Sequence, residues 1–259
     1  MVGGSGEIQG IAVMNQKIFV VRIRQAVLEI YNELTFLLED RFEVDGLSEP
    51  RDIASCSHRG CLYVNDYVKT IYRIDGYCMK HVIRWSVCDN LQGLSVSCRK
   101  TCNLLVTCKR GTLYEYTTYG QLIRIIRLAL ECISPMHAIE TLNGPLLVCH
   151  GWEPAELHCV CTLDDNGDLL TSFRGISDGT DPKNFNRPVR CAVDDAGRIF
   201  IADLSNNRIV MLNPSLTSSR VLFQLKDGLQ YPRRLCLDEM VGRLYVGCAD
   251  KLLVLRINK

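Results

Sequence analysis

The 259-residue sequence lacks an excess of charge of either sign, an apolar run long enough to cross a bilayer, and any Asn-x-Ser/Thr sequon. The formal net charge is +1, so nucleic acid or anionic lipid would need a local basic surface to bind. The N-terminus has neither the basic nor the apolar region of a signal peptide. We therefore expect a chain that is not inserted in a membrane and, with 47% hydrophobic residues, a substantial core.

Cysteine is abundant, and its 14 residues would suggest several disulfides in a secreted protein. Most of them nevertheless lie inside apolar strand-like segments, as Cys191 does, where a thiol acts as a small hydrophobe. This placement favours a reduced, cytoplasmic protein. Cys56 and Cys61 flank one turn, and Cys98 and Cys102 flank another, so each pair could face its partner across a hairpin. The sequence leaves their redox state open.

No sustained helical period runs through the chain; instead, one sequence pattern repeats at near-regular intervals. It consists of a Pro or apolar residue, a short apolar strand, a turn and a second apolar strand. The starts lie roughly 41 to 53 residues apart, a period typical of propellers and other repeat arrays. They are Ile8, Pro50, Leu91, Pro135, Pro188 and Pro232.

Each unit divides into four short segments rich in β-branched and aromatic residues, which predicts a four-stranded antiparallel meander. Such a sheet cannot bury both faces alone, so we predict an all-β, six-bladed β-propeller in a single domain, 1–259. A β-sandwich would explain the short strands but not the repeated sequence pattern. The predicted blades are 8–45, 46–88, 89–130, 131–176, 185–226 and 229–259.

The sixth unit has no outer strand of its own, because only two residues follow Ile257. Met1–Glu7 could pair weakly with its edge, but we expect a three-stranded last blade with an open edge. We also expect the chain to be the C-terminal part of a longer polypeptide.

Three stretches carry a resemblance to a known family. Arg174–Pro214 resembles the NHL-repeat consensus strongly, Tyr231–Gly247 moderately and Glu49–Asp66 weakly, while Leu62–Gly76 is similar to the repeat of the related YWTD propellers. Proline before the strand favours the NHL side. The resemblance implies a six-bladed propeller similar to the C-terminal NHL domains of tripartite-motif proteins, which act as recognition modules and some of which bind RNA.

The innermost strand of a propeller blade begins near one mouth of the central channel. The two positions after each start therefore predict a lopsided, basic ring there, suited to forked hydrogen bonds with carboxylate or phosphate. Solvated arginines at loop ends are the plainer interpretation. We expect a non-catalytic, monomeric module that binds a protein or peptide through this mouth. The candidate residues are Arg51, Asp52, His137, Arg190, Arg233 and Arg234.

Two other functions remain open. Single-stranded RNA would use the same cations, with Tyr231 or Phe185 as stacking surfaces. A calcium- or zinc-dependent hydrolase, like the lactonases among six-bladed relatives, needs several carboxylates or histidines in the channel, whereas the ring offers only Asp52 and His137. We therefore expect no catalytic residue, no metal and no cofactor, and we expect Asp203 to bind its own turn rather than a substrate.

Overall fold

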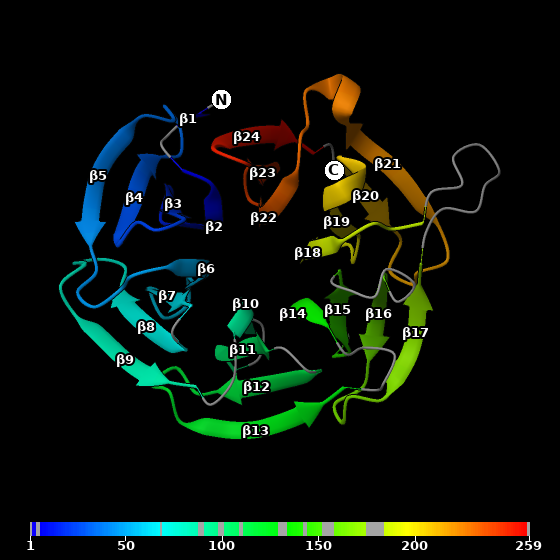
Figure 1. The fold of residues 1–259 in the computed structure, drawn as a ribbon, viewed down its shortest axis with the longest axis horizontal. Helices are drawn as coiled ribbons and strands as arrows, with labels where there is room; N and C mark the ends of the chain where they lie inside the picture. The colour runs from blue at the N-terminus through cyan, green and yellow to red at the C-terminus, as the bar shows by residue number, and fades with distance from the viewer. Residues whose placement is uncertain are drawn as a thin grey trace.

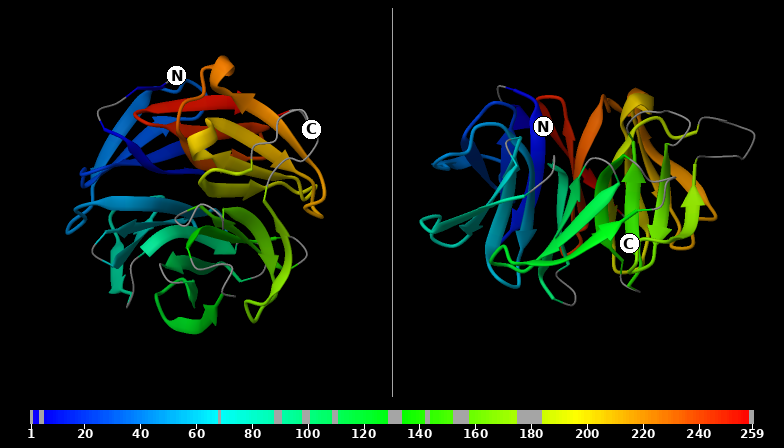
Figure 2. Two further views of the ribbon diagram at one scale, coloured as in Figure 1. Left: turned by 45° about the vertical axis from the view of Figure 1, so that its right-hand side comes forward. Right: turned by 60° about the horizontal axis from the view of Figure 1, so that its bottom comes forward.

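The computed structural model describes residues 2–3, 6–67, 69–87, 91–97, 101–108, 111–128, 134–141, 144–151, 158–174 and 184–257. Six four-stranded antiparallel sheets stand around one central axis (Figure 1). Two views from other sides show the same ring as a disc of radially placed sheets (Figure 2). The prediction of an all-β, six-bladed propeller is confirmed.

The strands run in chain order from the axis outward. The inner strands are β2 (Ile8–Met14), β6 (Pro50–Cys56), β10 (Leu91–Ser97), β14 (Pro135–Glu140), β18 (Pro188–Val193) and β22 (Pro232–Asp238). The second strands are β3 (Lys17–Arg22), β7 (Cys61–Asp66), β11 (Asn103–Cys108), β15 (Leu146–His150), β19 (Ile199–Asp203) and β23 (Arg243–Cys248). The third strands are β4 (Val27–Asn32), β8 (Thr70–Asp75), β12 (Thr112–Tyr116), β16 (Cys159–Leu163), β20 (Arg208–Leu212) and β24 (Lys251–Arg256).

The outer strands complete the first five blades. They are β5 (Leu38–Glu43), β9 (Val82–Ser86), β13 (Leu122–Arg127), β17 (Leu169–Phe173) and β21 (Ser219–Gln224). The sixth blade supplies three strands of its own, as expected, and its edge carries only the two-residue β1 (Val2–Gly3), which pairs with Leu252 and Lys251. Short 3-10 helices over Leu204–Asn206 and Leu225–Asp227 are the helical turns of the described chain. No helix in that part of the protein is long and apolar enough to span a bilayer.

The core lies between the blades. The described residues form six hydrophobic clusters, one at each interface between neighbouring sheets, because each sheet presents an apolar face to both neighbours. Phe19, Tyr63, Phe200 and Tyr245 are among the largest fully buried side chains. Burial of each such side chain contributes roughly 1.5–3 kcal/mol.

The ring closes between the sixth and first blades with polar contacts in addition to a cluster. The guanidinium of Arg22, on β3, donates to the carbonyl oxygen of Asp250 at 2.9 Å and to Glu29 at 2.7 Å. The Tyr245 hydroxyl, on β23, donates to the Glu33 carboxylate at 2.8 Å. These contacts join the first and sixth blades, which β1 links through only two paired residues.

Two local arrangements raised by the sequence are visible in the structure. Cys56 and Cys61 lie directly opposite each other on β6 and β7, and no disulfide joins them; a hydrogen bond between them, together with burial, raises the pKa of Cys61. Cys98 lies outside the described residues. Asp203 accepts hydrogen bonds from the Asn186 amide and the Arg208 guanidinium, so it ties the end of β19 to the neighbouring turns.

Every inner strand carries a β-bulge one residue after its start. The register shifts across the bulged residues, which are Gln9, Arg51, Gln92, Met136, Val189 and Arg233. A bulge adds a residue and re-aims the side chains around it. The bulges therefore place neighbouring residues at two different depths of the channel.

We expect Gly10→Ala, just inside the first bulge, to lower the free energy of unfolding by about 1–3 kcal/mol through overpacking. A methyl group there would lie 2.6 Å from the Ile53 amide nitrogen and 2.8 Å from its Cγ2. Urea titration measures the change, and Gly228→Ala, where no atom lies within 4 Å of the added methyl group but φ is +84°, shows the effect of backbone strain without crowding. Equal stability of Gly10→Ala and wild type would contradict the close approach.

Candidate functional site: a two-layered channel

One end of the channel opens into a cavity of about 360 Å³. All six bulge residues line it, so we call them the mouth ring. Around the axis, the ring is polar over four consecutive blades and apolar over the other two, because Met136 and Val189 sit on blades four and five. Leu91 and Leu204 extend its apolar surface. The mouth is thus two-sided, with cations on one part and hydrocarbon on another.

Both arginines of the mouth ring have acidic or aromatic neighbours. The Arg51 guanidinium lies over the ring of Tyr67, 4.4 Å from its centre, and Tyr67 is 56% exposed. The Arg233 guanidinium lies 3.0 Å from the Glu7 carboxylate, and both side chains are about one-third exposed. A cation over an aromatic face and an exposed ion pair each contribute modestly to stability. These two guanidiniums therefore remain partly accessible at the surface of the mouth.

The second layer lies one residue further along each inner strand and is buried; we call it the belt. It contains Gly10, Asp52, Gly93, His137, Arg190 and Arg234. Arg190 Nη1 donates to Asp52 Oδ2 across the channel, from blade five to blade two. Asp52 also accepts from the Leu94 amide of blade three at 2.8 Å.

His137 continues the belt through blades three, four and five. Its Nε2 lies 3.2 Å from the Leu94 carbonyl oxygen, and its Nδ1 lies 3.4 Å from the Cys191 amide nitrogen. These contacts fit the neutral imidazole with its proton on Nε2. Burial, followed by the charge of Arg190, lowers the pKa of His137 well below its usual range.

Arg234 closes the belt through blades six, one and two. Its Nε donates to the Gln9 carbonyl oxygen and its Nη2 donates to the Arg51 carbonyl oxygen at 2.9 Å. Burial lowers the pKa of Arg234 to about 9, against the opposing attraction of Asp52. The side chain is therefore still a cation near neutral pH, and it lies at the floor of the mouth cavity.

These positions correct the expectation of one basic ring at the mouth. Of the six predicted residues, only Arg51 and Arg233 lie there as partly exposed side chains; Asp52, His137, Arg190 and Arg234 are at least nine-tenths buried in the belt. Phe185, expected as a stacking surface, is also buried, at 3% exposure, in the core between blades four and five, because its ring packs against Phe173.

The two positions after each start place Gln9, Gln92, Met136 and Val189 at the channel, but sequence reasoning missed Tyr67 and Leu204. These two residues follow β7 and β19 and lie outside the starts of the inner strands. The signal was present in the repeat: the first position after every start lines the mouth, and the second joins the belt. A bulge at each start separates them, and no residue type marks it.

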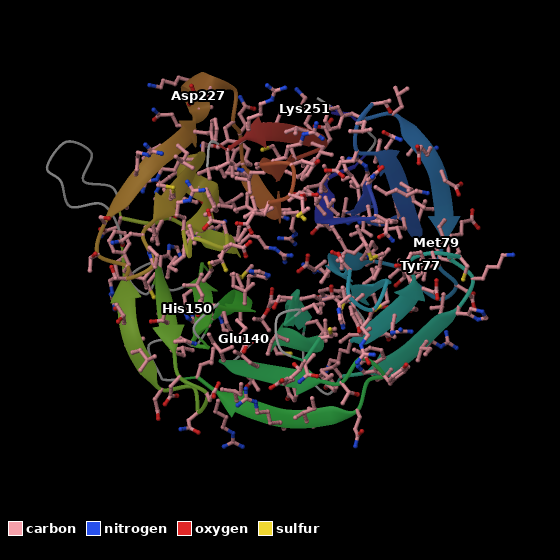
Figure 3. All side chains as sticks on the ribbon, turned by 180° about the vertical axis from the view of Figure 1, so that it is seen from behind. Tyr77, Met79, Glu140, His150, Asp227 and Lys251 are labelled. Carbon is pink, nitrogen blue, oxygen red and sulfur yellow. The ribbon has the colours of Figure 1, made fainter. Side chains whose placement is uncertain are left out.

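Beyond the belt, the channel opens into a second cavity of about 260 Å³, lined by later residues of all six inner strands. Glu140, at the end of β14, lines it and lies beside the central opening, whereas His150 lies further out in the fourth blade (Figure 3). His150 Nε2 contacts Cys161 Sγ at 3.4 Å. Among the residues that the structure describes, no three His, Cys, Asp or Glu side chains converge as a metal site would require.

We expect stability to fall below about pH 6.5 partly because of His137. The folded protein keeps this side chain neutral, while the unfolded chain binds a proton there, so stability is present above the unfolded pKa and is lost as the pH falls. The contribution reaches about 1.4 kcal/mol per pH unit. Urea titrations between pH 7 and pH 5 should show a shallower loss of stability for His137→Gln than for wild type; equal slopes for the two proteins would contradict the buried neutral imidazole.

Comparison with known proteins supports the fold. No protein-family model matches the chain, and no curated protein matches it. A streptogramin B lyase structure superposes with a TM-score of 0.71 at 10% identity, covering 99% of this chain and 96% of that one. Hydrazine synthase of Kuenenia stuttgartiensis gives 0.70 at 12% identity, covering 98% and 97%. Virginiamycin B lyase from Staphylococcus aureus gives 0.66 at 12% identity, covering 99% and 86%. At such identities the likeness shows that the chain shares the six-bladed propeller fold with these proteins.

Proposed function

We propose that this propeller is a non-catalytic recognition module that binds a protein partner through the mouth ring, and that it takes an acidic side chain flanked by an apolar one. The supporting observation is the division of the 360 Å³ mouth cavity, whose lining combines the cations Arg51 and Arg233 with the hydrocarbon of Met136 and Val189. Guanidinium groups hold carboxylates with forked hydrogen bonds, and the apolar part accepts a neighbouring hydrophobic side chain.

The belt supports the same proposal by fixing the shape of the mouth. Its hydrogen bonds connect all six blades, so the six bulges are held in place before a partner arrives. A preorganised surface loses little conformational entropy on binding. Rigid loops around a scaffold are suited to docking, and extended peptides are recognised by pockets of this kind.

The test uses fluorescent peptides in which Asp or Glu neighbours Leu or Phe, with Asn and Gln isosteres as the matched panel. We expect wild type to prefer the acidic peptides, and we expect the double variant Arg51→Glu/Arg233→Glu to weaken their binding about a hundredfold, since each guanidinium contributes roughly one charge-assisted hydrogen bond. Fluorescence anisotropy measures both. The natural partner is then sought by purification from the native source.

Arg220→Glu/Arg256→Glu is the matched control, because it makes the same charge change at exposed positions on β21 and β24. If both double variants weaken binding equally, net charge rather than the mouth is responsible. If wild type instead binds single-stranded RNA with a steep salt dependence, the module is an RNA binder. Thermal stabilisation by calcium or zinc would favour a metal-dependent hydrolase.

We also propose that the protein is related to the NHL-repeat propellers and works in the cytoplasm. The first rests on the Arg174–Pro214 stretch and on the strand starts Pro50, Pro188 and Pro232. The second rests on buried cysteine pairs such as Cys56 and Cys61, which lie opposite each other and are not joined by a disulfide. A reducing compartment keeps such thiols apart.

A further inference from the structure

The cavity on the far side of the belt from the mouth ring has a lining of its own; we call it the lower chamber. It holds about 260 Å³, and every inner strand contributes to it. Much of its wall is hydrocarbon, from half-buried side chains such as Val96, Ile139, Val193 and Leu237. A concave, mostly apolar cavity with few polar groups is typical of a small-molecule site.

Arg190 is the cationic residue in this lining. A guanidinium carries five N–H donors, and among the described residues Arg190 uses one of them, on Asp52. Its Nε is buried and has no hydrogen-bond partner there. Arg190 is 6% exposed, so water does not readily replace the missing partners. A buried donor without a partner costs about 1–3 kcal/mol, which a suitable acceptor would offset.

The charges of the belt do not balance. Arg190 and Arg234 are two buried cations, Asp52 is one buried carboxylate, and His137 is neutral. Arg234 donates to carbonyl and amide oxygens, and Asp52 is the carboxylate among the six belt residues. A net positive charge in a region of low dielectric favours an anion beside it.

We propose that the lower chamber binds a small amphipathic monocarboxylate. Its oxygens accept from the N–H groups of Arg190 that Asp52 leaves unused, and its compact apolar body packs against the half-buried Ile139, Val193 and Leu237. Glu140 lines the same chamber and disfavours a second negative charge on the ligand. The site lies across the belt from the mouth ring, so it is separate from the proposed partner surface.

The first test uses wild-type protein with benzoate and with benzamide, its neutral isostere. We expect benzoate to raise the melting temperature and to bind about tenfold more tightly than benzamide, the difference that a charge-assisted hydrogen bond supplies. Methyl NMR locates the ligand: resonances of Ile139 and Leu237 should shift, while those of Leu91 and Leu204 in the mouth cavity should not. Equal affinity for both probes, shifts confined to the mouth, or no binding would each overturn the proposal.

Variants then test the cation. Arg190→Lys keeps a charge opposite Asp52 but loses the forked donors, and we expect benzoate to bind about tenfold more weakly. If that variant does not fold, Ala192→Leu reduces the volume of the chamber from its half-buried wall and should also abolish the methyl shifts. Arg220→Gln, on the outer strand β21, is the control and should bind benzoate as wild type does. Unchanged binding by both chamber variants would overturn the site without touching the mouth proposal.

Discussion

Replacing Asp52 by alanine should lower the free energy of unfolding by about 3–5 kcal/mol. The substitution leaves Arg190 buried opposite no carboxylate, and it also removes the acceptor for the Ile53 and Leu94 amides, which donate at 2.9 and 2.8 Å. Equilibrium urea unfolding measures the loss. Since the bridge joins opposite blades, we expect the variant to unfold in one transition at lower urea.

Two further variants show whether the charge itself is responsible. Asp52→Leu/Arg190→Met removes both charges together, so it should be less destabilised than Asp52→Ala. Glu39→Ala removes an exposed pair with Lys17, 3.8 Å apart, and should cost less than about 1 kcal/mol. If Asp52→Ala is no less stable than Glu39→Ala, the bridge across the channel does not stabilise the ring.

Replacing Arg22 by leucine should have an effect of similar size, about 3–5 kcal/mol, at the closure between the first and sixth blades. Arg22 is 1% exposed, and its guanidinium donates to Glu29, to the Gly6 carbonyl oxygen at 2.8 Å and to Asp250. Its loss leaves the Glu29 carboxylate buried without its closest cation. Native-state hydrogen exchange should speed up first in blades one and six.

The matched control is Arg41→Leu. Arg41 approaches the same carboxylate, at 3.6 Å, but is 62% exposed, so we expect a loss below about 1 kcal/mol. Uniform acceleration of exchange in all six blades by Arg22→Leu would indicate that closure is not the weakest interface.

The architecture was predictable because its cause is local and repeated. Each start, from Ile8 to Pro232, precedes an apolar strand, a turn and a second apolar strand, and six such sheets must cover one another's faces. The three strands of the sixth blade were also predictable, because only two residues of this sequence follow Ile257. The pairing of β1 with Leu252 and Lys251 was not predictable, because the spacing of the repeats does not specify which residues of β24 it meets.

The site was predictable in position but not in depth. The two residues after each start do surround the channel, as the repeat indicates. Arg233 and Arg234 are adjacent in sequence, yet Arg233 is partly exposed and Arg234 is buried. Arg233 is the bulged residue of β22, whereas Arg234 pairs with Gly247 of β23. Backbone irregularity of this kind comes from pairing between strands, which a single segment does not encode.

The six bulges give the channel two independently variable tiers. A substitution at Arg51 or Met136 alters the surface of the entrance, while the hydrogen bonds that hold the blades together pass through the residues one step deeper. The rim of this scaffold can therefore diverge by single replacements at such half-buried positions while the cross-links beneath it are retained.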